Sequence, residues 1–450
     1  MARRTAALSG FPELLPADRV VEQRLVETLS RTFELHGFGN VETRAVEPLE
    51  QLLSKGETSK EVYVLRRLQE TDADATSGLG LHFDLTVPFA RYVVEHAGKL
   101  EFPFRRYQIQ KVWRGERPQE GRYREFTQAD IDIVGRDELA SHHDVEVARV
   151  MLDALRRLDF LPGFTLQVNN RKLLEGYFRG LGLEDPGPAM TAVDKLDKQS
   201  PEAVAALLVE GGMDADLAER CLRIATIATP DTGFVEQVRA LGVEHPLLDE
   251  GLAELEAVVA GCAPLVTDRV SVVADLKIAR GLDYYTGTVF ETRLTGHEGL
   301  GSICSGGRYD SLATDGRTTY PGVGISLGVS RVLVPLVNAG ALGGDRPVPS
   351  AVLVAVVDED SRPVSDAAAD ALRAHGVPCE VAPAAQRFGK QIRYAERRGI
   401  PYVLFPGDGE DSAEVKDIRS GEQVAVDPAT WTPPPQDLHP SVRTTTEEHP

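Results

Sequence analysis

The chain has 450 residues, enough for two or three domains, and its 49 lysines and arginines against 69 aspartates and glutamates give a formal net charge of −20. This acidic balance argues against a protein that coats nucleic acid nonspecifically, although it leaves room for local basic faces. Because we find no apolar run long enough to span a bilayer, no signal peptide and only four widely separated cysteines, we expect a cytoplasmic protein with reduced thiols and no membrane contact.

The first elements predicted along the chain are a helix and two short strands. Between Val21 and Phe33 apolar residues recur every four positions, which is typical of a helix with one apolar stripe, and Gly37 would end it. Short strands are expected at residues 38–43 and 62–65.

Residues 81–88 alternate between apolar and polar side chains, a pattern typical of a strand. On a strand Asp84 and Thr86 would share one face, and a carboxylate beside a hydroxyl suits a substrate ammonium group. A solvated strand face explains the same pattern equally well.

The densest polar segment, residues 104–135, predicts an antiparallel hairpin with one apolar and one polar face. Arg114 and Glu116 would share a face of the first strand, and an arginine-rich loop that includes Arg122 would lead to the second. That second strand would present three polar side chains together, those of Gln128, Asp130 and Asp132. Arginines near a row of carboxylates suit a phosphorylated ligand that also carries a positive group, and a plain surface hairpin is the alternative.

Helices are expected to follow the hairpin. Residues 138–158 carry an apolar stripe at helical spacing. Residues 171–265 are rich in Ala, Leu, Glu and Asp without strong alternation, which predicts a mostly helical insertion with a structural role.

The stretch that begins at Arg280 combines a cation, an acid and two phenol rings, those of Tyr284 and Tyr285. Its flanks, residues 270–276 and 288–290, are strand-like, so the stretch is expected at a sheet edge that opens onto a small polar molecule. The alternative is a plain hairpin with a buried tyrosine pair.

A glycine-rich segment at 305–310 precedes residues 320–331, which predict a strand that runs into a helix. Gly324 and Gly328 would let a planar ring approach the backbone closely, and Arg331, one helical turn in, would reach a terminal phosphate. The segment lacks the Lys-Ser/Thr pair of a phosphate-binding loop.

A linker at residues 338–349 precedes a second domain. There, strand-like and helical runs alternate up to a hairpin at 415–426, which predicts an α/β layer with a largely parallel sheet. The helix expected at 385–398 has a basic face that is either a contact for an RNA backbone or a solvated surface, formed by Lys390, Arg393 and Arg397 with Arg387 at its border. The tail from Thr432 is rich in Pro, Thr, Glu and His, so disorder is expected.

Together these segments resemble the histidyl-tRNA synthetases, a family of class II aminoacyl-tRNA synthetases. Arg280-Gly-Leu-Asp-Tyr-Tyr and Gly306-Gly-Arg-Tyr-Asp are similar to the two histidine-specific signatures, Arg114-Gly-Glu with its arginine loop is similar to class motif 2, and residues 322–331 are similar to motif 3. The resemblance implies an α+β fold with a class II antiparallel sheet core flanked by helices. Its parts would be the catalytic core (1–170 and 266–337), the helical insertion (171–265), the linker (338–349), an α/β anticodon-binding domain (350–431) and a disordered tail (432–450).

The activity that the resemblance implies joins L-histidine to ATP, giving histidyl-adenylate and pyrophosphate, and then transfers histidine to the 3′ end of tRNA(His). Carried over by motif, Arg114 and Arg280 are the catalytic residues at the α-phosphate, and both also contact histidine. The other ATP-binding residues would be Glu116, at adenine, and Arg122 and Arg331, at the outer phosphates. The other histidine-binding residues would be Asp84, Thr86 and Gln128 for the ammonium end and Asp132, Tyr284 and Tyr285 for the imidazole. A homodimer and Mg²⁺ bound with ATP are also implied, while the protein ligands of a metal are not identified.

Three positions depart from the family pattern. His82 stands where an arginine is usual, Arg44 replaces a proline that closes motif 1, and Ser330 replaces a glutamate before the motif 3 arginine.

Two other functions are compatible with this fold. A regulatory paralogue from histidine biosynthesis usually lacks both the anticodon domain and the signature arginines, so residues 350–431, Arg114 and Arg280 argue against it. A specialised or resistance-conferring duplicate of a synthetase would keep every motif, and the sequence does not distinguish it from the ligase.

Overall fold

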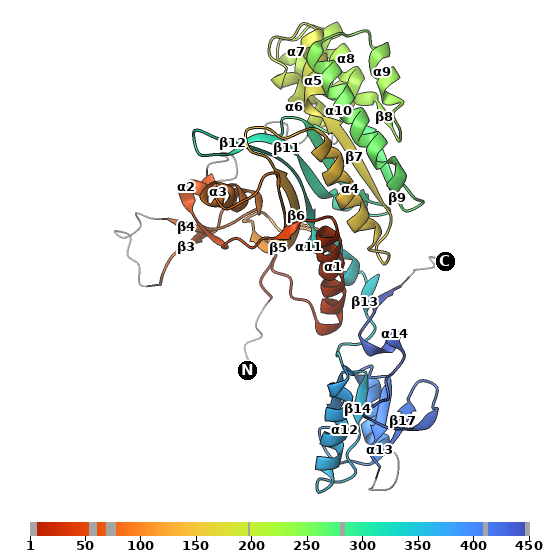
Figure 1. Cartoon of the computed structure of the whole chain (residues 1–450). Coiled ribbons are helices and arrows are strands. Elements are labelled where there is room, and N and C mark those ends of the chain that lie inside the picture. The colour runs from red at the N-terminus through yellow and green to blue at the C-terminus, as the bar shows by residue number, and fades with distance from the viewer. Residues whose placement is uncertain are drawn as a thin grey trace, which may run out of the picture. The chain divides into compact units, whose positions relative to one another are not determined.

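The computed structural model describes residues 7–53, 61–68, 78–196, 199–279, 284–407 and 413–445 (Figure 1). The chain divides into two compact units, one formed by the segment up to Pro12 with residues 26–334, the other by residues 13–25 and 335–450. Among the helices within the described ranges, none combines the length and apolar character needed to cross a membrane.

The first unit is organised around a large sheet to which nine strands of the described residues contribute. In spatial order the strands are β1 (Gly39–Asn40), β5 (Phe104–Trp113), β6 (Glu125–Val134), β12 (Thr319–Gly328), β11 (Ser302–Thr314), β10 (Thr288–Leu294), β7 (Phe164–Asn170), β9 (Val270–Asp275) and β8 (Ala228–Thr229). Along this order each strand from β5 to β7 pairs antiparallel with the next, whereas β1 pairs parallel with β5 and β7 pairs parallel with β9.

The predicted hairpin at 104–135 is present as β5 and β6, paired from Phe104 opposite Val134 to Trp113 opposite Glu125. The apolar side chains of β6 are buried, as their alternation predicts, because they face the core. The polar side chains of the same strand are buried too: Asp132 is only 4% exposed. The polar face of β6 is therefore covered by protein.

The strands on either side of the Arg280 stretch do not form a hairpin with each other. β7 lies between β9 and β10, pairing parallel with the first and antiparallel with the second. The hairpin interpretation of this stretch is therefore wrong, because the partner of both flanks is a strand about a hundred residues earlier in the chain. Residues 280–283 themselves lie outside the described part of the chain.

Residues 81–88 are not the predicted strand, because a helix, α3 (Thr86–His96), begins within them. The Asp84 carboxylate accepts a hydrogen bond from the Val87 amide at 3.0 Å, which satisfies one of the free donors of the first helical turn. The short run of alternating residues is compatible with a helix start as well as a strand, and this hydrogen bond favours the helix. A separate sheet of three strands, β2 (Val46–Pro48), β3 (Val64–Leu65) and β4 (Leu79–Leu81), precedes α3 in the chain. The short helix α2 (Leu49–Leu52) follows β2.

Two predicted helices follow the apolar stripes that suggested them. α1 (Pro16–Leu35) buries its stripe from Val21 to Phe33 completely, and α4 (His142–Arg156) packs against β12 and β6. The strand-to-helix transition predicted near the end of this unit is also present, since α11 (Val329–Asn338) follows β12 directly.

The region 171–265 is mainly helical, as predicted. α5 begins immediately after β7, with the Asn170 side chain accepting from the amides of Lys172 and Leu173 as an N-cap. α5 and α10 cross so closely that a β-carbon on Gly176 would lie 2.1 Å from the Leu248 nitrogen. The helices are α5 (Arg171–Gly180), α6 (Gly187–Lys195), α7 (Pro201–Glu210), α8 (Ala215–Arg223), α9 (Phe234–Ala240) and α10 (Pro246–Cys262), and short 3₁₀ turns occur at Ile224–Thr226, Ala263–Leu265 and, beyond this region, Glu298–Leu300.

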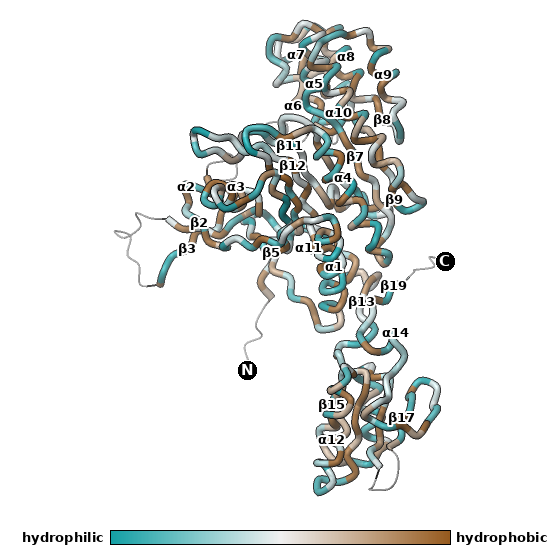
Figure 2. Tube along the Cα trace, viewed as in Figure 1, coloured by the Kyte–Doolittle hydropathy of each residue, from teal (hydrophilic) through white to brown (hydrophobic). Residues whose placement is uncertain are grey.

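The second unit contains the predicted α/β layer. Its sheet has a parallel part, β15–β14–β16, continued by antiparallel β17 and β18, and apolar clusters cover both faces. Figure 2 shows apolar colouring along the strands beside β15. The elements are β14 (Val352–Val354), α12 (Arg362–Ala374), β15 (Cys379–Val381), α13 (Phe388–Arg397), β16 (Tyr402–Phe405), β17 (Ala413–Asp417) and β18 (Gln423–Val426).

The tail from Thr432 was expected to be disordered, but its described part is structured up to Thr445. It contains α14 (Pro435–Leu438) and β19 (Val442–Thr444), and β19 pairs with β13 (Leu342–Gly344) inside the predicted linker. The Asp437 carboxylate accepts from the Tyr402 hydroxyl at 2.7 Å. Backbone pairing and side-chain contacts of Asp437, which also pairs with Arg419, hold this segment, and composition alone predicts neither.

Candidate active site

A cavity of about 280 Å³ opens where the β5–β6 hairpin meets β11, β12 and the start of α11. Its walls are mostly polar. The lining residues are Glu61, Arg114, Glu116, Gly121, Arg122, Tyr123, Phe126, Gln128, Ser302, Ile303, Ser305, Ser326, Gly328 and Arg331. Five predicted site residues therefore line one cavity, although more than two hundred positions separate the first, Arg114, from the last, Arg331.

Arg114 and Glu116 lie just beyond the end of β5 rather than within it, which corrects the predicted strand position. The Arg114 side chain is held by a hydrogen bond from its Nε to the Phe83 carbonyl at 2.9 Å, and its guanidinium lies 5.1 Å from the centre of the Phe126 ring. Glu116 lies between two cations, 3.9 Å from Arg114 and 3.6 Å from Arg122. One carboxylate thus faces two arginines and leaves excess positive charge.

Arg331 adds a third cation from the opposite wall. It stands on the first turn of α11, its Nε donates to the Leu300 carbonyl at 3.0 Å, and the residue lines the cavity. Three guanidinium groups around a cavity of this size are suited to a polyphosphate, because each can make two parallel hydrogen bonds to phosphate oxygens.

A short hydrogen-bonded path leads from this cavity into a buried acidic cluster. Gln128 Nε2 donates to Ser326 Oγ at 2.6 Å, and the Ser326 hydroxyl in turn donates to Asp130. Gln128 and Ser326 line the cavity, whereas Asp130 is 3% exposed. The cationic and acidic regions are therefore parts of one continuous polar interior.

The acidic cluster is centred on Asp132. The Tyr309 hydroxyl donates to Asp132 Oδ1 at 2.8 Å, and Arg106 Nη2 lies 2.5 Å from Oδ2. The ring of Tyr284 stacks on that of Tyr309 with 5.8 Å between centres, and the Tyr285 ring meets Tyr284 edge-on at 5.0 Å. Tyr284 and Tyr285, two of the residues predicted to bind the imidazole, therefore lie in the same cluster as the third, Asp132.

Burial controls the protonation of this cluster. It raises the pKa of Asp130 to about 7, against the opposing charge of Arg106 and with the help of neighbouring Asp132. Burial also holds the pKa values of Tyr284 and Tyr309 well above the ordinary value, with nearby acids adding to the effect. The phenols therefore stay protonated and act as neutral hydrogen-bonding groups.

The remaining predicted site residues do not line the cavity. Asp84 and Thr86 are half-buried at the start of α3, and Asp84 is close enough to the tyrosines to contribute to the raised pKa of Tyr284. Arg280 lies outside the described residues. Gly324, expected to admit a planar ring, instead gives room to Asp132: a β-carbon there would lie 2.1 Å from Asp132 Oδ1.

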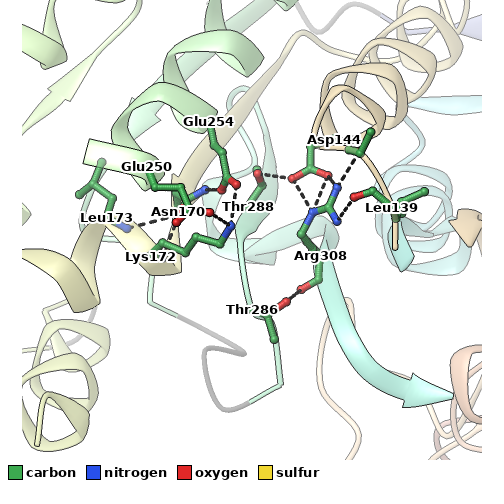
Figure 3. A network of polar contacts seen from close by, with 11 residues as sticks. Leu139, Asp144, Asn170, Lys172, Leu173, Glu250, Glu254, Thr286, Thr288 and Arg308 are labelled. Atoms are coloured by element: carbon green, nitrogen blue, oxygen red, sulfur yellow. Dashed lines mark hydrogen bonds and ion pairs between the residues drawn. The ribbon is translucent and has the colours of Figure 1, made fainter. Parts of the chain in front are cut away.

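Arg308 of the glycine-rich segment is fully engaged within the protein. Its guanidinium pairs with Asp144 of α4 and donates to the carbonyls of Leu139 and Ala140, as Figure 3 shows. Asp144 also accepts from the Thr288 hydroxyl at 2.6 Å. This buried pair therefore joins the middle of the sheet to α4 and is not available to a ligand.

The residues that depart from the family pattern also have internal partners. The His82 ring contacts the Lys111 carbonyl through Nε2 at 2.7 Å and stacks on Trp113, and burial lowers its pKa so that it stays neutral. The Ser330 hydroxyl accepts from the Thr127 amide at 2.9 Å and so ties α11 to β6, and Arg44 pairs with buried Glu47 at 3.0 Å.

Sequence reasoning did not identify Arg106 as part of the site, and it placed Tyr309 only within a motif. Arg106 lies directly opposite Asp132 in the β5–β6 register. A cation opposite an acid in a predicted hairpin is the sequence signal for this pair. The signal is weak, because cations on strands are usually solvent-exposed.

An antiparallel sheet that carries a cation-lined cavity at a hairpin and a strand-to-helix turn, followed in the chain by an α/β domain, is the architecture of a class II aminoacyl-tRNA synthetase. Comparison with known proteins narrows the class. A family model described as Histidyl-tRNA synthetase matches residues 10–332, and one described as Anticodon binding domain matches residues 351–430.

Similar proteins cover nearly the whole chain. The histidine–tRNA ligase of Cutibacterium acnes is 60% identical across 98% of this chain and 99% of its own, and that of Micrococcus luteus is 58% identical across 98% of each. The crystal structure of histidyl-tRNA synthetase from Nostoc sp. PCC 7120 has a TM-score of 0.83 and 35% identity, over 94% of this chain and 97% of the other. The chain belongs to the histidyl-tRNA synthetase family.

Proposed function

We propose that this protein is a histidine–tRNA ligase, which activates L-histidine with ATP and then transfers it to the 3′ end of tRNA(His). The observation that carries the proposal is the continuity of two electrostatically opposite regions: the arginine-lined cavity leads through Gln128 and Ser326 to the buried acids and tyrosines. Histidyl-adenylate has matching halves, an anionic phosphate on one side and the ammonium and imidazole groups on the other.

The arginine-lined region is assigned to ATP. Arg114 and Arg280 act at the α-phosphate, where attack by the histidine carboxylate builds up negative charge, and both also contact histidine. Arg122 and Arg331 hold the outer phosphates, and Glu116 contacts adenine. The common cavity supports the four assignments other than Arg280, whose role rests on its motif.

The acidic region is assigned to histidine. Gln128, at the border of the two regions, holds the ammonium end with Asp84 and Thr86. The imidazole is held by Asp132, Tyr284 and Tyr285, whose raised phenolic pKa values keep both tyrosines neutral beside the acid. Neutral and charged acceptors together distinguish an imidazole from an apolar ring of similar size.

Mg²⁺ enters this reaction with ATP. The described residues contain no group of three or more His, Cys, Asp or Glu side chains arranged to hold a metal. The cavity does offer the carboxylates of Glu61 and Glu116, and protein-bound Mg²⁺ commonly uses one or two carboxylates together with substrate phosphates. These residues therefore fit an ion held mainly through the phosphates, where it would neutralise negative charge.

The division of labour along the chain follows the family pattern. The catalytic core comprises residues 1–170 and 266–337, the insertion 171–265, and the tRNA-recognising domain 350–431 after a linker at 338–349. The active form is a homodimer that works in the cytoplasm. Relatives named histidine–tRNA ligase, which match this chain over nearly its whole length, support the ligase function over that of a regulatory paralogue.

The first test is histidine-dependent exchange between ATP and pyrophosphate, with transfer to tRNA(His) measured in parallel. Arg114→Ala and Arg280→Ala are expected to lower exchange by at least about a hundredfold, since each removes a transition-state contact to phosphate. Arg317→Ala is the matched control, because Arg317 is exposed in a turn and does not line the cavity.

Each outcome separates the candidate functions. Exchange together with charging of tRNA(His) establishes the ligase, whereas exchange without charging indicates a specialised duplicate. Absence of exchange from folded protein contradicts the enzymatic assignment and favours a regulatory role.

A further inference from the structure

Arg106 is a fully buried cation near the start of β5, and nothing in the reaction assigned above uses it. Its exposed fraction is 0%, and it is among the largest side chains with no exposed surface. One face of its guanidinium lies 4.2 Å from the centre of the Phe89 ring. A cation in such a position needs an explanation, because an apolar residue of similar volume often stabilises a buried site as well or better.

The contacts of Arg106 are concentrated on the acids of β6. Nη2 lies 2.5 Å from Asp132 Oδ2 and 4.0 Å from Asp130 Oδ2, and Nη1 is 3.4 Å from Gln108 Oε1. Within the described residues neither its Nε nor its Nη2 has a hydrogen-bond partner, so Nη2 contacts Asp132 as an ion pair without a well-formed hydrogen bond. The side chain is thus incompletely satisfied as a structural group, but it is well placed to balance two carboxylates.

Arg106 also fixes the direction of the Asp132 carboxylate. Tyr309 donates a hydrogen bond to Oδ1, and Arg106 Nη2 forms an ion pair with Oδ2. The Gly324 backbone closes the third side, because a β-carbon on Gly324 would overlap Oδ1. Contacts on both oxygens therefore restrict the direction in which the carboxylate faces.

We propose that Arg106 is a positioning residue for histidine recognition: it holds Asp132 ionised and oriented so that the carboxylate accepts an N–H of the imidazole. This inference rests on the proposed ligase function. Without Arg106, two neighbouring buried acids would lack a counter-charge, and one would take up a proton. A protonated acid donates from one oxygen, and the imidazole N–H would lose its strong acceptor.

The charge balance of the cluster supports this role. Burial already raises the pKa of Asp130 to about 7, and Arg106 is the main influence that lowers it. The other titratable groups near the pair are Asp84 before α3, Tyr284 and Tyr285, and Tyr309 on β11. These groups add negative charge or none, so within the described residues Arg106 supplies the positive charge that acts on Asp130.

The test compares Arg106→Leu and Arg106→Lys with Arg105→Leu by pyrophosphate exchange from pH 6 to 9. Arg105 is the next residue on the same strand, is a third exposed, and pairs with Glu146 outside the site. Arg106→Leu is expected to raise the KM for histidine by about 10- to 100-fold relative to wild type, while the KM for ATP changes less than about twofold. Arg106→Lys keeps the charge and is expected to restore part of the loss.

The pH profile distinguishes positioning from a structural defect. In Arg106→Leu the histidine KM, divided by the wild-type value at each pH, is expected to fall as pH rises, because the acids then lose the extra proton. Arg106→Leu combined with Asp130→Asn removes the competing acid and is expected to recover part of the affinity at neutral pH.

Several results would overturn the inference. Equal changes in the KM values for histidine and ATP, or a pH-independent loss, would assign Arg106 a structural role only. If Arg106→Leu does not fold, Arg106→Lys decides: a rise in the histidine KM without a matching rise in the ATP KM supports positioning, and equal changes in the two KM values contradict it. A wild-type protein without histidine-dependent exchange would instead contradict the proposed function.

Discussion

Asp130 and Asp132 are two residues apart on β6, yet their charges are balanced differently. Asp132 pairs directly with Arg106, while Asp130 is 4.0 Å from that guanidinium and accepts a hydrogen bond from Ser326. Asp130 therefore takes up a proton near neutral pH, and its pKa of about 7 makes it the side chain of the site that titrates in the physiological range.

This titration predicts a pH-dependent contribution to stability. The folded-state pKa of Asp130 lies above its ordinary value, so the folded protein binds the proton more tightly than the unfolded chain does, and wild-type stability falls as pH rises from about 4 to 7. The Asp130→Asn variant lacks this pH-dependent contribution to the free energy of unfolding, because asparagine does not titrate. The Tm of the variant minus that of wild type is therefore expected to increase between pH 5 and pH 8, measured by calorimetry.

Asp315→Asn is the control for this measurement. Asp315 is exposed, and hydrogen bonds from the Thr318 and Arg317 amides lower its pKa, so it is ionised throughout that pH range in both states. Its Tm difference should stay constant. A constant difference for Asp130→Asn as well would contradict the titration.

Arg331 should affect only one of the two substrates. It lines the cationic cavity, whereas Asp132 and Tyr309 are not among the residues that line it. Arg331→Ala is expected to raise the KM for ATP by about 10- to 100-fold, the effect of losing a charge-assisted hydrogen bond to phosphate, with the histidine KM nearly unchanged. Steady-state exchange with each substrate varied in turn measures this, with Arg317→Ala as the reference, and a matching rise in the histidine KM would contradict the assignment.

At the level of elements, the crossing of α5 and α10 is set by two glycines. A β-carbon on Gly176 would overlap the backbone of α10, and one on Gly251 would lie 2.2 Å from the Leu173 nitrogen in α5. Backbone meets backbone on both sides, so neither helix can move aside by rotating a side chain. The absence of side chains is therefore what lets these helices pack.

This close approach predicts opposite effects for the same substitution at two helical glycines. Gly251→Ala is expected to lower the free energy of unfolding by about 1–3 kcal/mol through overpacking, although alanine favours helices. Gly389→Ala in α13, where no atom lies within 4 Å of the new β-carbon, is expected to be neutral or to stabilise by about 0.5 kcal/mol. Urea unfolding of both variants measures the difference, and equal effects would contradict the packing argument.

The elements also show what the sequence could predict. α1 and α4 follow from local periodicity, because their apolar stripes are buried at the helical period. The β5–β6 hairpin follows from the alternation of its side chains, although burial does not alternate along β6. The insertion helices follow from composition. The α3 start was misassigned because a few alternating residues fit both periods, and a side chain to backbone hydrogen bond decides between them. The pairing of β9 and β10 with β7 was unpredictable, because it joins segments about a hundred residues apart.

The site was predictable to a similar extent. Arg114, Glu116, Arg122, Gln128 and Arg331 were identified from motifs, and they do converge on one cavity. The supporting contacts were not predictable, because Arg106 and the Arg308–Asp144 pair gain their importance from burial, and burial of a charge is the outcome of tertiary packing.

At the scale of the whole molecule, an acidic chain must still meet an acidic partner in RNA. The basic face predicted on α13 is present: Lys390, Arg393 and Arg397 are exposed, and none forms an ion pair within the described residues. This face lies in the second unit, away in sequence from the cavity residues of the first.

The two activities should therefore respond separately to loss of this face. Replacing Lys390, Arg393 and Arg397 with alanine is expected to raise the KM for tRNA(His), and to reduce the slope of log affinity against log salt by about 2, without changing pyrophosphate exchange. Arg362→Ala with Arg373→Ala on α12 is the control, since both of those arginines already pair with carboxylates. An unchanged salt slope would show that α13 does not contact the RNA backbone.

The helical insertion joins the sheet within the crossover between β7 and β9. β7 and β9 are parallel neighbours, so the chain must cross over between them, and α10, which packs on both strands, makes that return. Gly180, at the end of α5, lies beside Val243 and Glu244, just before α10 begins. The segment between these points leaves and re-enters at one place, and it carries the edge strand β8 of the sheet. Differences in the length of this segment therefore enter the molecule at a single point of the crossover between β7 and β9.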